Sequence, residues 1–269
     1  MLNADQYIHE QAMFNNKYVP GELVANSFLA FCRKGSCCGS GNQVSVWNSA
    51  FPTRTFHGAL TRQMVASLYN FYQQSQSNGF LCWEYLPGAP SEREKRWYFH
   101  RKDSQLPERV MKSRPTIVEP SSDIHLHIET AAEAFGMSCA EKGRQIRYLQ
   151  EVSKDHELIF FNAKIEESLR GTVCLRKGSQ RTFNLSNLGV HPLFQKNHIG
   201  SSLLARALEF TRGHSVVLET TNPVMAEHLM PKFGFQLTGE RYFYEVTALH
   251  SYFCENEPEQ DNRLPSANS

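Results

Sequence analysis

The sequence predicts an α/β (α+β) protein whose C-terminal domain contains a mixed, mostly antiparallel twisted sheet flanked by helices. Apolar residues alternate between helical and strand spacing through residues 113–250. Strand-like runs at 158–161 and 172–175 are separated by a polar stretch, which indicates an antiparallel hairpin. A strand–helix–strand run at 182–220 predicts a parallel pair, joined by a right-handed crossover.

Length and charge narrow the classes of function. The chain has 269 residues, of which 41% are hydrophobic, enough for one large or two ordinary domains. The net charge is +1, so no overall field would gather nucleic acid or a membrane surface, and we expect small-molecule chemistry. The N-terminus resembles no signal peptide and no apolar run approaches 18 residues, so we expect a cytoplasmic protein.

The cysteines predict free thiols rather than disulfides or a metal site. Their number is odd, and no pair has the C-x-x-C spacing. The cluster Cys32, Cys37 and Cys38 has no matching Cys or His pair at zinc-ligand spacing, so we expect no metal. The glycine-rich stretch 35–41 lacks the Gly-Lys-Ser/Thr ending of a phosphate-binding loop, which favours a flexible loop.

Prolines and charges set the predicted domain limits. Residues 88–115 have the composition of a boundary, and we place the junction near residue 112. The prediction is therefore an N-terminal α/β domain over 1–112, a second domain over 113–250, and a disordered tail over 251–269. In the first domain we expect strands at 27–32, 44–47 and 80–85 and a helix at 60–74.

The second domain begins with predicted helices at 128–135 and 146–152. His125 and His127 precede the first of them on what we expect to be an extended segment, where a surface position is favoured over a metal pair.

The strand predicted at 182–190 contains a change of phase. Phe183 and Leu185 are odd-numbered apolar residues, whereas Leu188 and Val190 are even-numbered. A strand keeps one face in the core across such a shift by a β-bulge, here near Ser186 and Asn187. A bulge leaves backbone N–H groups unpaired, and these could hold a ligand.

The next helix is predicted over about 199–212, with Gly213 as its stop, and a buried strand follows at 215–220. A helix at 225–233 and strands at 236–238 and 241–246 complete the domain. The loop that opens the 199–212 helix follows the bulged strand directly. Its free N–H groups and the positive helix end favour binding of a diphosphate, and Gly200 lets the phosphate oxygens approach the backbone closely.

These residues resemble the GNAT N-acetyltransferases. The family signature is Gln/Arg-x-x-Gly-x-Gly/Ala after a strand that ends in Val-x-Pro, and Gln195, Gly200 and Val190-His191-Pro192 match it. The resemblance covers about 115–248, including Lys232-Phe233-Gly234-Phe235. It implies the acyl-CoA N-acyltransferase fold, in which the parallel strands splay apart. Residues 56–83 weakly resemble the degenerate N-terminal half of two-domain GNAT proteins.

The resemblance implies transfer of an acetyl group from acetyl-CoA to a primary amine, on a small molecule or a protein, by direct attack. The amide at the bulge would polarise the thioester carbonyl. It also implies the cofactor-binding residues, namely Leu188, Gly189, Val190, Gln195, Lys196, Asn197, His198, Ile199, Gly200, Ser201, Ser202 and Asn222.

Three positions depart from the family pattern. His198 replaces the first glycine of the loop, and Met230 stands where a tyrosine often protonates the leaving thiolate. The asparagine expected before the last helix aligns with Pro223, one residue beyond Asn222.

The sequence therefore leaves the identity of the catalytic residues open. Glu219 could act as a base, directly or through water, or could be a solvent-facing strand residue. Tyr242 and Tyr244 could replace the missing acid or could serve strand packing. The alternative function is a GNAT-fold module that binds CoA or another protein without turnover.

Overall fold

The computed structural model describes residues 4–18, 21–32, 48–54, 56, 58–90, 92–102, 117–165, 168–178 and 181–256. The chain forms two compact units, each assembled from separate stretches of sequence. The first unit contains Met1–Phe14 and Arg96–Glu240, and the second contains Asn15–Lys95 and Arg241–Ser269. The predicted junction near residue 112 lies outside the described residues.

The second unit is a small mixed sheet with the strand order β1-β2-β3-β4-β11. Strands β3 and β4 are parallel, while the other pairs are antiparallel. Helix α2 begins where the Thr61 side chain accepts a hydrogen bond from the Met64 N–H, and it packs against α8. The elements are β1 (Glu22–Val24), β2 (Phe28–Ala30), β3 (Ser49–Pro52), α2 (Arg62–Gln74), β4 (Phe80–Trp83), β11 (Gln236–Glu245) and α8 (Val246–Asn256).

The chain end differs from the sequence prediction. A disordered tail was expected from residue 251, but α8 continues to Asn256. Its residues Val246, Leu249 and Phe253 are buried with those of α2 and β4, and this tertiary burial stabilises a helix whose sequence is weakly periodic. The strand predicted at 44–47 lies outside the described residues.

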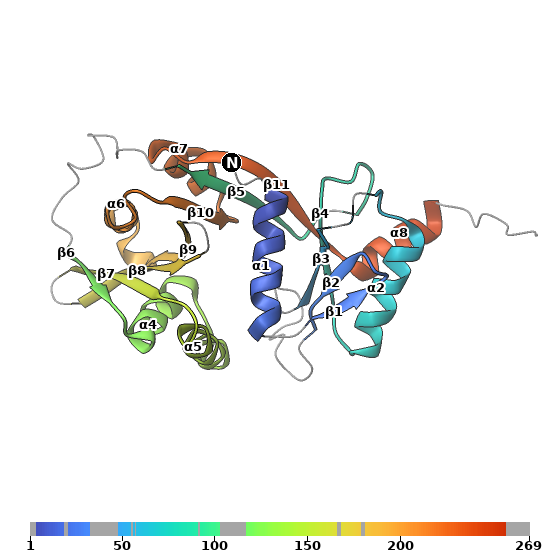
Figure 1. Cartoon of the computed structure of the whole chain (residues 1–269), viewed down its shortest axis with the longest axis horizontal. Helices are drawn as coiled ribbons and strands as arrows, with labels where there is room; N and C mark the ends of the chain where they lie inside the picture. The colour runs from blue at the N-terminus through green and yellow to red at the C-terminus, as the bar shows by residue number, and fades with distance from the viewer. Residues whose placement is uncertain are drawn as a thin grey trace, which may run out of the picture. The chain divides into compact units, whose positions relative to one another are not determined.

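The first unit is a mixed sheet with the order β11-β5-β10-β9-β8-β7-β6, which confirms the predicted fold class. Helix α4 lies on one face with α5 beside it, and α6 lies on the other face (Figure 1). Strands β7 and β8 form the predicted antiparallel hairpin. The elements are α1 (Ala4–Tyr18), β5 (Glu94–Arg101), β6 (Ile117–Ser121), α4 (Ile124–Phe135), α5 (Cys139–Ser153), β7 (Leu158–Ile165), β8 (Ser168–Lys177), β9 (Thr182–Val190), η2 (Pro192–Phe194), α6 (Ile199–Phe210), β10 (Ser215–Thr220), η3 (Met225–Leu229) and α7 (Met230–Lys232).

Strand β5 lies within the segment whose composition predicted a domain boundary. It pairs antiparallel with β10, and most of its residues belong to the first unit. Its charged residues have partners there: Arg96 forms an ion pair with Glu219, and the buried Arg101 donates from Nε to the Phe233 carbonyl at 2.9 Å. The charges therefore stabilise a strand, because tertiary partners compensate for their burial.

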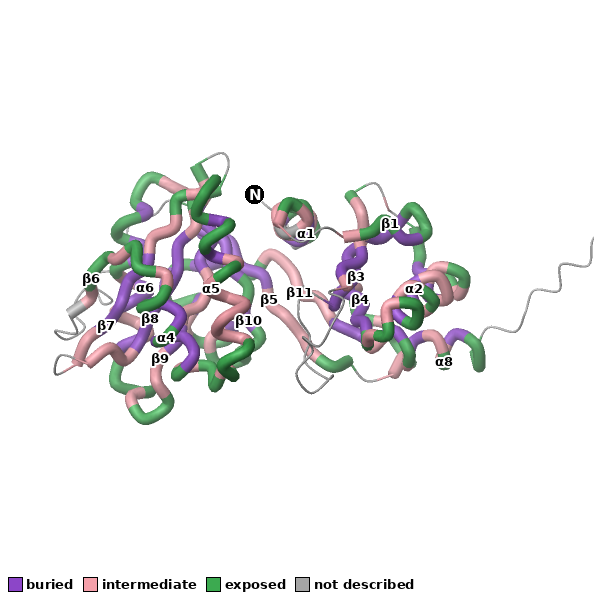
Figure 2. Tube along the Cα trace, turned by 90° about the horizontal axis from the view of Figure 1, so that it is seen from below, coloured by how far each residue is buried: buried purple, intermediate pink, exposed green. Residues whose placement is uncertain are grey.

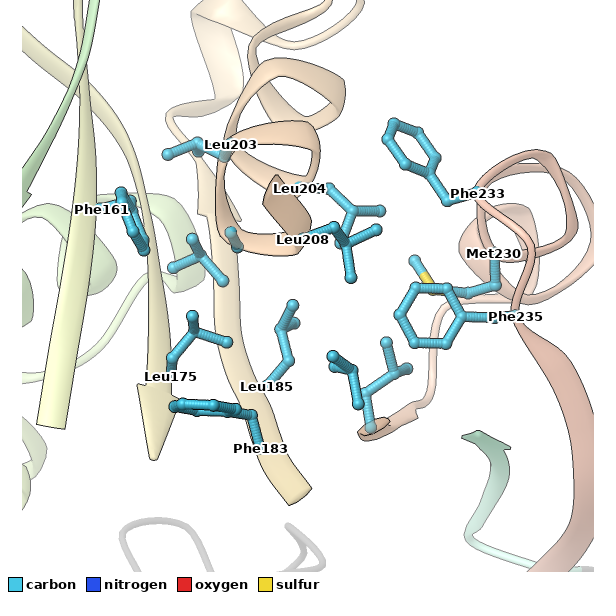
Figure 3. Close-up of a cluster of buried hydrophobic side chains, with 14 of the residues drawn as sticks. Phe161, Leu175, Phe183, Leu185, Leu203, Leu204, Leu208, Met230, Phe233 and Phe235 are labelled. Carbon is cyan, nitrogen blue, oxygen red and sulfur yellow. The ribbon is translucent and has the colours of Figure 1, made fainter. Parts of the chain in front are cut away.

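The core of the first unit lies between the sheet and α6. Leu203, Leu204 and Leu208 of α6 belong to one buried cluster with the strand residues Leu175 and Leu185 (Figure 3). Figure 2 shows buried residues along the strands of this unit and exposed ones on loops and outer helix surfaces. This core fixes α6, and with it the loop that precedes the helix, against the sheet.

The packing of α8 is testable by removing its largest buried side chain. We expect Phe253→Ala to lower the free energy of unfolding by about 3 kcal/mol, because the ring is buried. Ser251→Ala, at an exposed position of the same helix, should change it by less than about 0.5 kcal/mol. Urea unfolding of both variants measures the difference, and equal stabilities would contradict a packed α8.

Candidate functional site

The predicted β-bulge is present in β9. Its pairing with β8 steps from Gly189 opposite Thr172 to Ser186 opposite Cys174, so two residues of β9 lie opposite the single residue Val173. The extra residue is Asn187, whose φ of 52° lies in the left-handed region. The phase change read from the sequence therefore corresponds to a local break in the ladder.

The parallel strands β9 and β10 are paired only along the part of β9 that precedes the bulge. Strands β9 and β10 pair from Thr182 and Ser215 to Asn184 and Val217, and no pair follows. Beyond that point β10 continues along β5, where Glu219 lies opposite Tyr98. Among the described residues, the part of β9 from the bulge onward therefore has no strand partner on its β10 side.

The loop after β9 presents the N-terminus of α6. Lys196 and His198 both have positive φ, at 66° and 62°, and both are exposed. His198 thus adopts the conformation that a glycine would favour at this position, at a cost of order 1 kcal/mol. The first turn of α6 contains no acidic residue, and the His198 side chain makes no capping hydrogen bond. Free N–H groups beside the positive helix end suit an anion.

Side chains tie this loop to its surroundings. Gln195 donates from Nε2 to the Val190 carbonyl at 3.3 Å, which joins the loop to the end of β9. The Ser202 hydroxyl donates to the His198 carbonyl at 3.1 Å, so that hydroxyl is engaged within the helix. A Cβ added at Gly200 would lie 3.6 Å from Val190 Cγ2, an ordinary contact distance.

Gly189 is needed for packing on the opposite face. A Cβ added there would lie 2.8 Å from the Ala134 Cβ and 2.9 Å from the Phe135 ring. Helix α4 therefore packs directly on the backbone of β9 beside the bulge, at a distance that excludes larger residues.

The candidate catalytic residues fall in different units. Glu219 is in the first unit, exposed, with its Oε1 3.0 Å from Arg96 Nη1. Tyr244 is in the second unit, where it is buried and its hydroxyl accepts a hydrogen bond from the Leu86 N–H at 2.9 Å. Burial raises the pKa of Tyr244, and the residue belongs to the apolar core of the second unit.

Two further sequence positions have structural roles. Met230 is fully buried in the core of the first unit, as Figure 3 shows. The Asn222 side chain accepts hydrogen bonds from the Val224 and Met225 N–H groups, at 2.9 and 3.3 Å. Asn222 thus caps the turn that follows β10, whatever else it contacts.

Sequence reasoning missed one residue at the site, His127. It was predicted on an extended surface segment, but α4 begins at Ile124 because Asp123 caps it through the Leu126 N–H. His127 therefore lies inside the helix and is fully buried. Its ring stacks on Phe160, with centroids 4.3 Å apart. The capping pattern of an Asp before an apolar run was the signal that could have placed it.

Two structural features are absent from the described residues. No three His, Cys, Asp or Glu side chains gather there as a metal site. None of the described helices is both long and apolar enough to cross a membrane.

Comparison with known proteins shows what the domain around this site is similar to. Residues 125–235 match the model of the acetyltransferase (GNAT) family. No curated protein matches the sequence. A functionally unknown conserved protein from Staphylococcus epidermidis ATCC 12228 is similar over 86% of this chain and 95% of its own, with 13% identity and a TM-score of 0.57. A GCN5-related N-acetyltransferase from Sphaerobacter thermophilus is similar over 74% and 72%, with 14% identity and a TM-score of 0.51. At these identities the two structures show a shared fold.

The buried His127 predicts a dependence of stability on pH. Burial lowers its pKa from 6.5 to about 4. As the pH falls through this interval the unfolded chain binds a proton that the folded chain does not, so the free energy of unfolding should fall by up to about 3 kcal/mol. Urea unfolding at several pH values measures this. His127→Phe should reduce the dependence, whereas the exposed His125→Phe should retain it, and an identical dependence in all three proteins would contradict the assignment.

Proposed function

We propose that the chain transfers the acetyl group of acetyl-CoA to a primary amine by direct attack, because residues 125–235 match the model of the acetyltransferase (GNAT) family. The observation that carries the proposal is the coincidence of three features in β9 and the loop after it. The strand is bulged at Asn187, it has no pair with β10 beyond Asn184, and it leads directly into the N-terminus of α6.

In this proposal, the loop binds the diphosphate of acetyl-CoA through backbone N–H groups between Lys196 and Ser201. Lys196 adds a positive charge, and Ser201 adds a hydroxyl, since that of Ser202 is engaged by His198. Leu188, Gly189 and Val190 offer backbone groups on the unpaired edge of β9, where an extended pantetheine arm would be held as an added strand is held.

The chemical step needs a polarised carbonyl and an unprotonated amine. We assign the first role to the backbone N–H at the bulge, that of Leu188, which would stabilise negative charge on the thioester oxygen. We assign the second to Glu219, which lies on β10 beyond the last pair with β9. The thiol of CoA resembles that of cysteine, whose pKa is near 8.5, so its thiolate can leave without a strong acid.

We further propose that the second unit is a degenerate GNAT half. Strand β3, helix α2 and the parallel strand β4 repeat the order of β9, α6 and β10, and an antiparallel strand follows β4 in the sheet, as β5 follows β10. No loop of the GNAT signature type precedes α2, so the proposal places cofactor binding in the first unit alone.

The cofactor site is tested by a charge placed at Gly200. Isothermal titration of the wild type with acetyl-CoA and with CoA should give micromolar affinity, and Gly200→Asp should weaken it at least about tenfold by repelling the diphosphate. Gly200→Asn has the same size without the charge and should bind more tightly than Gly200→Asp. Binding by wild type without turnover on a panel of amines would favour the CoA-binding module, and no binding at all would exclude the proposed function.

The role of Glu219 is tested by breaking its ion pair from both sides. Glu219→Gln and Arg96→Gln each remove the pair, but only the first removes the carboxylate. If Glu219 is the base, Glu219→Gln should lower kcat about 100-fold or more, while Arg96→Gln should retain most activity. Steady-state release of CoA thiol measures both. Equal losses would instead indicate a structural ion pair.

A further inference from the structure

A chain of four polar side chains crosses the sheet of the first unit and ends at the bulge. The Thr172 hydroxyl lies 2.7 Å from Asn162 Oδ1 and 2.7 Å from His127 Nδ1. His127 Nε2 lies 3.4 Å from Nδ2 of Asn187, the extra residue of β9. The four residues come from β7, β8, α4 and β9, and three of them are buried.

The chemistry of these groups fixes the direction of the hydrogen bonds. Thr172 has one hydroxyl proton, which it donates to the Asn162 carbonyl oxygen. The Thr172 oxygen must then accept the proton carried by His127 Nδ1. Because burial lowers the pKa of His127 to about 4, the imidazole is neutral at pH 7 and its Nε2 is an acceptor. It therefore accepts from the Asn187 side-chain amide.

This contact acts on an unusual part of the backbone. Asn187 has positive φ, which asparagine tolerates better than other non-glycine residues but which still depends on support from its surroundings. Helix α4 also packs closely on Gly189, two residues further along β9. The helix therefore contacts β9 on both sides of Leu188, once by a hydrogen bond and once by packing.

We propose that His127 is a positioning residue for acetyl transfer, holding Asn187 through Nε2 so that the N–H at Leu188 points at the thioester oxygen. The inference rests on the proposed function. His127 touches neither acetyl-CoA nor the amine; it acts through the bulge. Its loss should therefore affect the transition state more than the binding of CoA, whose diphosphate is held by the separate loop before α6.

The test compares three variants of the full chain. His127→Phe keeps a ring against Phe160 but removes both hydrogen bonds, and we expect kcat for CoA thiol release, with acetyl-CoA and an amine active with the wild type, to fall at least about tenfold. The Kd for CoA, by isothermal titration, should stay within about twofold. His127→Gln can place an acceptor near the position of Nε2 and should retain more activity. His125→Phe, at an exposed position of the same helix, should behave as wild type.

A second measurement uses the wild type and needs neither activity nor a stable variant. Nitrogen-15 NMR of the histidine-labelled protein at pH 7 should show His127 protonated at Nδ1 and unprotonated at Nε2. Protonation at Nε2 would overturn the inference, as would wild-type kcat in His127→Phe or parallel losses of kcat and CoA affinity. A wild type that binds no CoA would overturn the proposed function instead, and the NMR result would still report on the His127 contact.

Discussion

The register between β8 and β9 is the constraint on which the candidate site depends. One extra residue in β9, Asn187, places two residues opposite Val173 and shifts the register of the rest of the strand by one residue. Without it, Leu188 and Val190 would exchange faces with Gly189, and α4 would meet a side chain where it now packs on a glycine. The bulge therefore sets the helix packing on β9 and the direction of the backbone beside the loop.

Helices that pack on both faces of the sheet restrict the position of β9. On one face α6 packs so closely that a Cβ at Gly171 would lie 3.0 Å from Ile199 and Leu203, which fixes the helix whose N-terminus opens the loop. On the other face α4 contacts β9 through His127 and beside Gly189. Strand β9 is thus held by packing on both faces, while its pairing with β10 ends at Asn184.

The spacing of residues within single segments predicted those parts of the site that depend on residues adjacent in the chain. The change of phase between Leu185 and Leu188 indicated the bulge, because a strand must keep its apolar face buried. The amphipathic run after Ile199 indicated α6, and Gln195 and Gly200 indicated its loop. His127 was misplaced because its neighbours read as extended, while the Asp123 cap that begins α4 was overlooked. Its contacts with Thr172 and Asn187 join residues 45 and 60 positions apart, which no local pattern shows.

By itself the sequence determined the fold class, the bulged strand and the crossover helix, and it predicted an anion-binding loop, since each depends on side-chain periodicity or on residues adjacent in the chain. Only the tertiary structure decided that β5 belongs to the sheet of the first unit. The charged residues of β5 are typical of a linker in the sequence, but in the fold Arg101 donates to the Phe233 carbonyl and Arg96 pairs with Glu219. The tertiary structure also decided that Tyr244 belongs to the core of the second unit and that His127 is buried at the bulge. These outcomes depend on partners far away in the chain, which become neighbours only when the sheets form.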